Sequence, residues 1–173
     1  MNTLELNTTD GSIAYAVGIT LVATLGGLLF GYDTAVISGT TSFLTAYYGL
    51  SAAMLGWAAS CALIGCVVGA VFAGLFSNVI GRKKVLVASA ILFFISAVGT
   101  GFPPSFSAFI IFRIIGGIAV GAASMTSTMY IAEISPARHR GRLVSLNQLA
   151  IVFGMLLVYF VNYFIVEIGR AHV

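Results

Sequence analysis

Charge is scarce in this sequence. Asp, Glu, Lys and Arg make up 8% of its 173 residues, and 60% of the residues are hydrophobic. Soluble proteins carry about 25% charged residues, and a chain this apolar cannot cover its surface with polar groups. A soluble domain is therefore excluded. We expect an all-α integral membrane protein, because lipid offers backbone groups no partner and period-2 alternation is absent.

The sequence also has few cysteines and few catalytic side chains, and this excludes several classes of function. Residues 1–12 contain no Lys or Arg and no small-residue cleavage site, which excludes a signal peptide. The two cysteines, Cys61 and Cys66, share one apolar run and point to different helix faces, so we predict neither a disulfide nor a metal site. No nucleophile and base, or set of metal ligands, fits an intramembrane enzyme. We therefore predict no catalysis and no cofactor.

Five stretches are long and apolar enough to cross a bilayer core of about 30 Å. The predicted spans are residues 13–39, 51–76, 85–102, 107–134 and 143–166. This organisation leaves 1–12 as an N-terminal segment and 167–173 as a tail.

The basic residues predict the orientation. Six of the eight Lys and Arg lie in two alternate connections, 77–84 and 135–142, whereas the connections 40–50 and 103–104 contain none. By the positive-inside rule the basic connections face the cytoplasm. We expect a multi-pass protein of the inner (plasma) membrane with residues 1–12 in the cytoplasm. The same placement explains the net charge of +3 better than nucleic-acid binding does.

Asp33 is an ionisable residue inside the first predicted span, within the run GGLLFGYDTAVISG. A charge at the centre of a membrane helix costs roughly 2.5–3.5 kcal/mol on insertion scales, so such residues face a partner or a cavity. Arg113 lies at the same predicted depth, about 9 Å below the outer edge. Arg113 could also anchor its helix by reaching the interface. The matched depth favours an intramembrane ion pair.

Two further patterns concern packing and the cytoplasmic ends. Three G-x-x-x-G spacings predict close helix approach; they are formed by Gly27 and Gly31, Gly65 and Gly69, and Gly117 and Gly121. Glu133, near the inner end of the fourth span, is placed to pair with Arg82 or Arg140.

Three signatures together resemble the sugar porter family of the major facilitator superfamily over about residues 13–166. They are GGLLFGYDTAVISG, the G…GRKK connection at 74–84, and RIIGGIAVG followed by YIAEISPARHRG. The resemblance implies twelve spans in two six-helix halves with the substrate bound between them. The chain would then supply five helices of the N-terminal half, with the missing C-terminal half as its partner.

The resemblance also implies roles for single residues. The aspartate matching Asp33 takes up the coupling proton, and the arginine matching Arg113 modulates its proton affinity. Phe30 matches an aromatic residue that packs against the sugar, and Gln148 matches a glutamine that hydrogen-bonds sugar hydroxyls. From the residues alone, Phe30 would be assigned to the lipid-facing core and Gln148 to the interface.

In the same family the residues matching Arg82, Glu133 and Arg140 form a cytoplasmic latch that closes the inner ends. The sequence departs from the family pattern at Asn78 and Val79, where an acidic and a basic residue are usual, so we expect a weaker latch. Thr128 also stands where relatives often have proline.

The tail 167–173, EIGRAHV, matches the translation of a common sequencing adapter. We therefore expect it to be non-native sequence after a truncation.

These observations predict the N-terminal fragment of a proton-coupled symporter for a monosaccharide, a xylose-like pentose or a hexose, working by alternating access. Two alternatives stay open. One is a sugar facilitator without proton coupling, and the other is a non-transporting sugar sensor.

Overall fold

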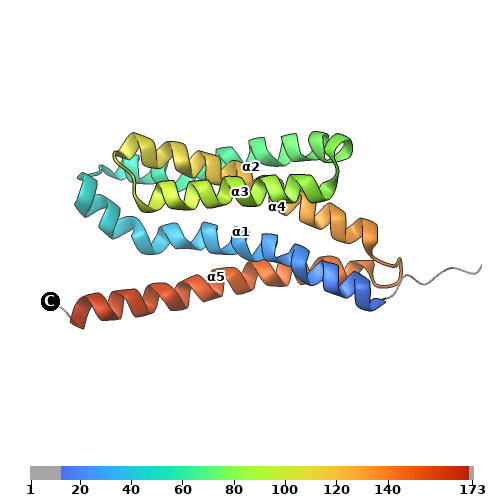
Figure 1. Cartoon of the computed structure of the whole chain (residues 1–173). Coiled ribbons are helices and arrows are strands. Elements are labelled where there is room, and N and C mark those ends of the chain that lie inside the picture. The colour runs from blue at the N-terminus through green and yellow to red at the C-terminus, as the bar shows by residue number, and fades with distance from the viewer. Residues whose placement is uncertain (1–12, 172–173) are drawn as a thin grey trace, which may run out of the picture.

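The computed structural model describes residues 13–171, with side chains from Val17 to Ile165, and all its regular structure is helical. Its five helices are α1 (Ile13–Tyr48), α2 (Ala52–Ile80), α3 (Arg82–Gly101), α4 (Phe106–Ile134) and α5 (Arg140–Ala171) (Figure 1). Each contains a stretch long and apolar enough to cross a membrane, with mean hydropathies of 1.5 to 2.2. The predicted cytoplasmic segment 1–12 lies outside the described residues.

The first helix is longer than predicted. We expected residues 40–50 to be a connection, but α1 continues to Tyr48. This stretch has no proline, and the hydroxyls of Thr40, Thr41 and Thr45 donate to carbonyls of the preceding turn. The helix ends where Gly49 adopts a φ of 62°, a conformation that glycine reaches without steric cost.

The last helix is also longer than the predicted span 143–166. It begins at Arg140, after a turn in which the backbone amides of His139 and Arg140 donate to the carbonyl of Pro136. It continues to Ala171, so residues 167–171 of the predicted tail extend α5, and 172–173 lie outside the described residues.

Short connections make neighbouring helices antiparallel. Ser51 and Ser105 cap α2 and α4 by accepting hydrogen bonds from the amides of Met54 and Ala108. Gly81, at a φ of 94°, is the whole connection between α2 and α3. The basic connections therefore lie at the same end of the bundle as the start of α1, opposite the end where α5 finishes (Figure 1).

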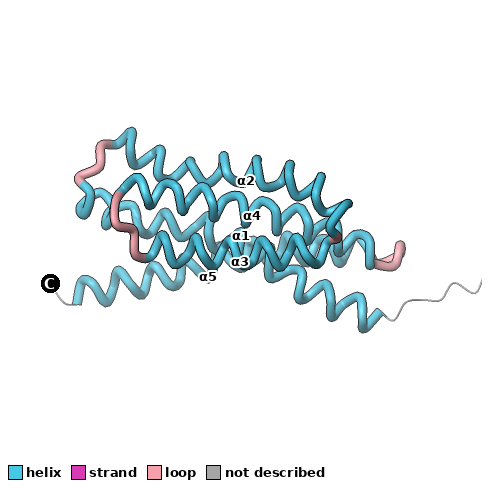
Figure 2. Tube along the Cα trace, turned by 45° about the horizontal axis from the view of Figure 1, so that its top comes forward, coloured by secondary structure: helices cyan, strands magenta, loops and turns pink. Residues whose placement is uncertain are grey.

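Helix α4 is central to the bundle. It packs most extensively on α2, also on α3 and α1, and more lightly on α5, whereas α1 packs mainly on α5 (Figures 1 and 2). Small side chains face the interior, as on α2: Ala58, Cys61, Ala62, Gly65, Gly69, Ala73 and Ser77. Large apolar side chains such as Val67, Val71 and Phe72 face outward. This arrangement is the reverse of a soluble core and fits lipid as the solvent.

Two helix crossings bring backbones into direct contact at glycines. A Cβ added at any of these glycines would overlap a carbonyl group of the facing helix. In the α2–α4 crossing the glycines and facing residues are Gly117 and Ala62, Gly121 and Cys66, and Gly69 and Ile118. In the α1–α5 crossing they are Gly27 and Asn147, Gly31 and Ile151, and Gly154 and Leu28.

These contacts repeat along the chain with constant offsets. Adding 90 to the residue number of a contact position on α1 gives the equivalent position on α4, as for Gly27 and Gly117. Adding 85 to a contact position on α2 likewise gives the equivalent position on α5, as for Ala62 and Asn147. All three pairs of contacts obey both offsets. The α1–α5 crossing is therefore a structural repeat of the α4–α2 crossing, the kind of internal repeat found in transporters.

Candidate functional site

An ion pair lies inside the bundle between α1 and α4. Arg113 Nη1 donates to Asp33 Oδ1 at 2.9 Å. The side chains of Arg113 and Asp33 are 8% and 18% exposed, so the arginine does not extend to the surface as an anchor would. Arg113 Nε is buried and has no partner among the described residues. A guanidinium that keeps one donor free can exchange its carboxylate partner for another group as helices move.

Phe30 and Gln148, the predicted sugar-binding residues, lie at about the same level as each other along the length of the bundle. The α1–α5 crossing sets this level, because Gly27 meets Asn147 and Gly31 meets Ile151 on either side of them. Phe30 is half-buried one turn before Asp33, and Gln148 is exposed. Sugar binding by these two residues stays a prediction.

A second polar cluster joins three helices at the basic end. Arg82, at the start of α3, contacts Glu133 of α4 through Nη2 and Oε1 at 2.7 Å, and Nε is 3.2 Å from both carboxylate oxygens. Its Nη1 donates to Ser77 Oγ and Asn78 Oδ1 of α2, each at 2.8 Å. We call Ser77, Asn78, Arg82 and Glu133 the Arg82 cluster. It ties α2, α3 and α4 together at one end.

Arg140, the third predicted gating residue, is outside this cluster. Its side chain is exposed, and it has no ion-pair partner in the part of the chain that the structure describes. Of the two partners considered for Glu133, the structure selects Arg82, because α3 begins directly beside the end of α4.

Sequence reasoning missed two polar contacts. Ser77 reads as a helix-end serine, yet it accepts a hydrogen bond from Arg82. Asn147 is buried on α5, and its Nδ2 donates to Thr128 Oγ1 on α4 at 3.1 Å. An asparagine within an apolar run was the available signal for the second contact.

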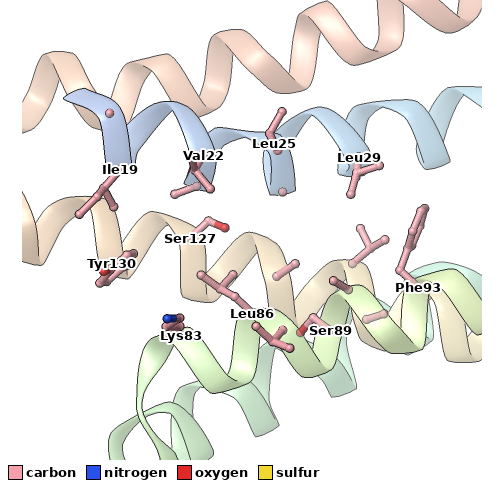
Figure 3. A pocket seen from close by; sticks show the side chains of 18 residues that line it. Ile19, Val22, Leu25, Leu29, Lys83, Leu86, Ser89, Phe93, Ser127 and Tyr130 are labelled. Atoms are coloured by element: carbon pink, nitrogen blue, oxygen red, sulfur yellow. The ribbon is translucent and has the colours of Figure 1, made fainter. Parts of the chain in front are cut away.

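A groove of about 830 Å³ lies between α1 and α3, with α4 at its base. Figure 3 shows Ile19, Val22 and Leu29 of α1 on the side that faces it, and Leu25 is also among its lining residues. The opposite wall, on α3, includes Leu86 and Phe93. The few polar residues that line the groove include Lys83 and Ser89 of α3 and Ser127 and Tyr130 of α4. None of the seven predicted site residues lines it. The groove is thus separate from the Asp33–Arg113 pair.

The fold and the two polar clusters define a class: a multi-pass α-helical membrane protein with a charged pair between its helices. Comparisons with known proteins agree. The family model described as "Sugar (and other) transporter" matches residues 19–172. The chain is 50% identical to the D-xylose-proton symporter of Escherichia coli (strain K12), over 94% of the chain and 38% of that protein. It is 48% identical to the D-xylose transporter of Levilactobacillus brevis, over 80% and 30% respectively.

Solved structures give the same result. The inward open conformation of the E. coli xylose transporter XylE matches with a TM-score of 0.80 and 54% identity, over 87% of this chain and 40% of that one. A partially occluded inward open conformation of the same transporter matches with a TM-score of 0.82 and 49% identity, over 89% and 41%.

The chain belongs to the sugar transporter family. It corresponds to the N-terminal portion of the major facilitator superfamily fold and spans less than half the length of these relatives.

Proposed function

We propose that the chain is the N-terminal part of a proton-coupled monosaccharide symporter that works by alternating access. The observation that supports this most is the intramembrane Asp33–Arg113 pair at 2.9 Å, in a chain 50% identical to a D-xylose-proton symporter. A charge pair inside a membrane protein is costly, and its common uses are proton relays and substrate pathways. Transport, not catalysis, is the proposed activity.

The pair provides a way to couple proton and sugar movement. A carboxylate in a desolvated site binds a proton more readily when its guanidinium partner moves away, and releases it when the partner returns. Asp33 lies on α1 and Arg113 on α4, so a small relative movement of these helices changes their separation. Sugar held by Phe30 and Gln148, on α1 and α5, would bias this movement. The monosaccharide and the proton are the proposed substrates.

The proposed orientation follows from the bundle ends. Both basic connections lie at the end where α1 starts. By the positive-inside rule this end faces the cytoplasm of the inner (plasma) membrane, with residues 1–12 on the same side.

We propose that a sixth helix of the N-terminal half packs in the groove between α1 and α3. On α4, the contact with α3 includes the hydrogen bond from Ser96 to the carbonyl of Phe112, and Gly116 faces Ser96. By the offset of 90, the positions on α1 equivalent to Phe112 and Gly116 are Val22 and Gly26, and both line the groove. A helix docked there would repeat the α3–α4 contact.

A chimera tests the proposed function. Residues 1–166 replace the corresponding segment of the E. coli D-xylose-proton symporter, and sugar uptake is measured in cells lacking other xylose transporters. We expect the chimera to accumulate a pentose or hexose, with accumulation abolished by a protonophore. Uptake that only equilibrates the sugar would instead indicate a facilitator. A well-inserted chimera that neither transports nor exchanges sugar would contradict the proposal.

The Arg82 cluster yields a separate prediction. Arg82→Gln removes the ion pair with Glu133 that joins α3 to α4 at the proposed cytoplasmic end. Because partly exposed ion pairs contribute modestly, we expect a two- to fivefold shift, roughly, toward the inward-open state. The measurement is the labelling rate of a thiol introduced on the cytoplasmic side of the chimera. Glu133→Gln should shift the rate in the same direction and add little in the Arg82→Gln background, whereas fully additive shifts would contradict a shared latch.

A further inference from the structure

Asn147 is a buried amide at the closest approach of α1 and α5. The residue is 4% exposed. A Cβ at Gly27 would lie 2.5 Å from Asn147 Oδ1 and 2.9 Å from its backbone oxygen, so the glycine leaves room for the amide. Asn147 Oδ1 has no hydrogen-bond partner among the described residues. The glycine Cα–H that points toward this oxygen offers a weak contact of the kind found between close helices.

The nitrogen side of the amide reaches a third helix. Asn147 Nδ2 donates to Thr128 Oγ1 at 3.1 Å, and the Thr128 hydroxyl donates its own proton to the carbonyl of Ser124 at 3.0 Å. Donors and acceptors therefore match, because the lone pairs of Thr128 remain free to accept the amide. One side chain thus links α5 to α4 by a hydrogen bond and contacts α1 at Gly27.

Packing alone does not require an amide at this position. The internal repeat places Ala62 of α2 at the equivalent position, facing Gly117 as Asn147 faces Gly27. A small apolar residue therefore satisfies the same crossing. Burying an amide with an unpaired oxygen costs free energy. Polar residues in helix interfaces commonly serve to fix register and orientation.

Register and rotation of α5 matter for the next residue. Gln148 follows Asn147 by one position, which is about 100° around the helix. It is exposed and lies at the depth of Phe30. We propose that the Asn147–Thr128 hydrogen bond is a positioning device that fixes the rotation of α5 and so directs Gln148 toward the sugar. This inference rests on the proposed symport function.

The test uses the chimera with Thr128→Val, which removes the hydroxyl at nearly constant volume, and Thr128→Ser, which keeps it. Interhelical hydrogen bonds in membranes have modest strength, so we expect Thr128→Val to raise KM for the sugar about threefold to tenfold. The maximal rate should change much less, and Thr128→Ser should match the parent. If the parent chimera transports and Thr128→Val leaves KM unchanged, the positioning role is wrong while the symport function stands.

A second measurement does not depend on transport. A thiol introduced by Gln148→Cys, in a chimera without other cysteines, is labelled in membranes with a charged methanethiosulfonate reagent. We expect Thr128→Val to change its labelling rate and Thr128→Ser to leave it unchanged. Tyr47→Cys, at the exposed end of α1 opposite the basic connections, is the control and should respond to neither. Equal rates at position 148 in all three backgrounds would overturn the inference.

Discussion

Asp33→Asn is expected to abolish accumulation of sugar against its gradient in the chimera, so that the inside-to-outside ratio falls to about one. The amide keeps the size of the side chain, and its oxygen can still accept a hydrogen bond from Arg113 Nη1. In the parent this nitrogen lies 2.9 Å from Asp33 Oδ1. The amide cannot take up a proton, and uphill movement loses its driving force. Exchange of sugar across the membrane without a proton gradient should persist. Both quantities are measured with radiolabelled sugar in vesicles.

Thr34→Asn is the matched control, because Thr34 is the exposed neighbour of Asp33 on the same helix. It should leave accumulation at the level of the parent chimera. Unchanged accumulation in Asp33→Asn would refute the coupling role. Loss of exchange together with accumulation would show that Asp33 serves sugar binding or folding instead.

Gly117→Ala is expected to destabilise the bundle strongly. The added Cβ would overlap the backbone carbonyl of Ala62, and backbone cannot turn aside as a flexible side chain can. The α2–α4 crossing would have to open, and overpacking of this kind costs about 1–3 kcal/mol. We expect a clear fall in the thermal unfolding midpoint of the detergent-purified chimera, followed by intrinsic fluorescence and size exclusion.

Gly74→Ala is the control for this experiment. A Cβ at Gly74 meets nothing within 4 Å, so the same chemical change there should leave the midpoint unchanged. A midpoint for Gly117→Ala equal to that of Gly74→Ala would contradict the close approach of α2 and α4.

Much of the fold could be predicted from composition and run length. The five apolar stretches were enough to identify five helices, because a helix is the only simple way to satisfy backbone groups in lipid. Helix ends were harder to predict. The threonines after Gly39 read as a polar connection, but their hydroxyls bond to their own helix and let α1 continue to Tyr48.

The candidate site was partly predictable. Asp33 and Arg113 stand out in the sequence because charge is so rare in these runs, and matched depth suggested their pairing. The partner of Glu133 could not be chosen from the sequence, since Arg82 and Arg140 both lie near its end of the bundle. The structure pairs it with Arg82 because α3 starts next to the end of α4.

The sequence by itself determined that the chain lies in lipid and has five helices, since these follow from composition and run length. Its local motifs determined the family resemblance, and the rarity of charge pointed to the candidate site residues. Only the tertiary structure decided which helices cross. It placed Asn147 against Gly27 and Thr128, and it related the α1–α5 and α4–α2 crossings by constant offsets. Glycine spacings show that some helices can approach closely. They cannot name the partner, because every small-residue face fits several others until the whole bundle is packed.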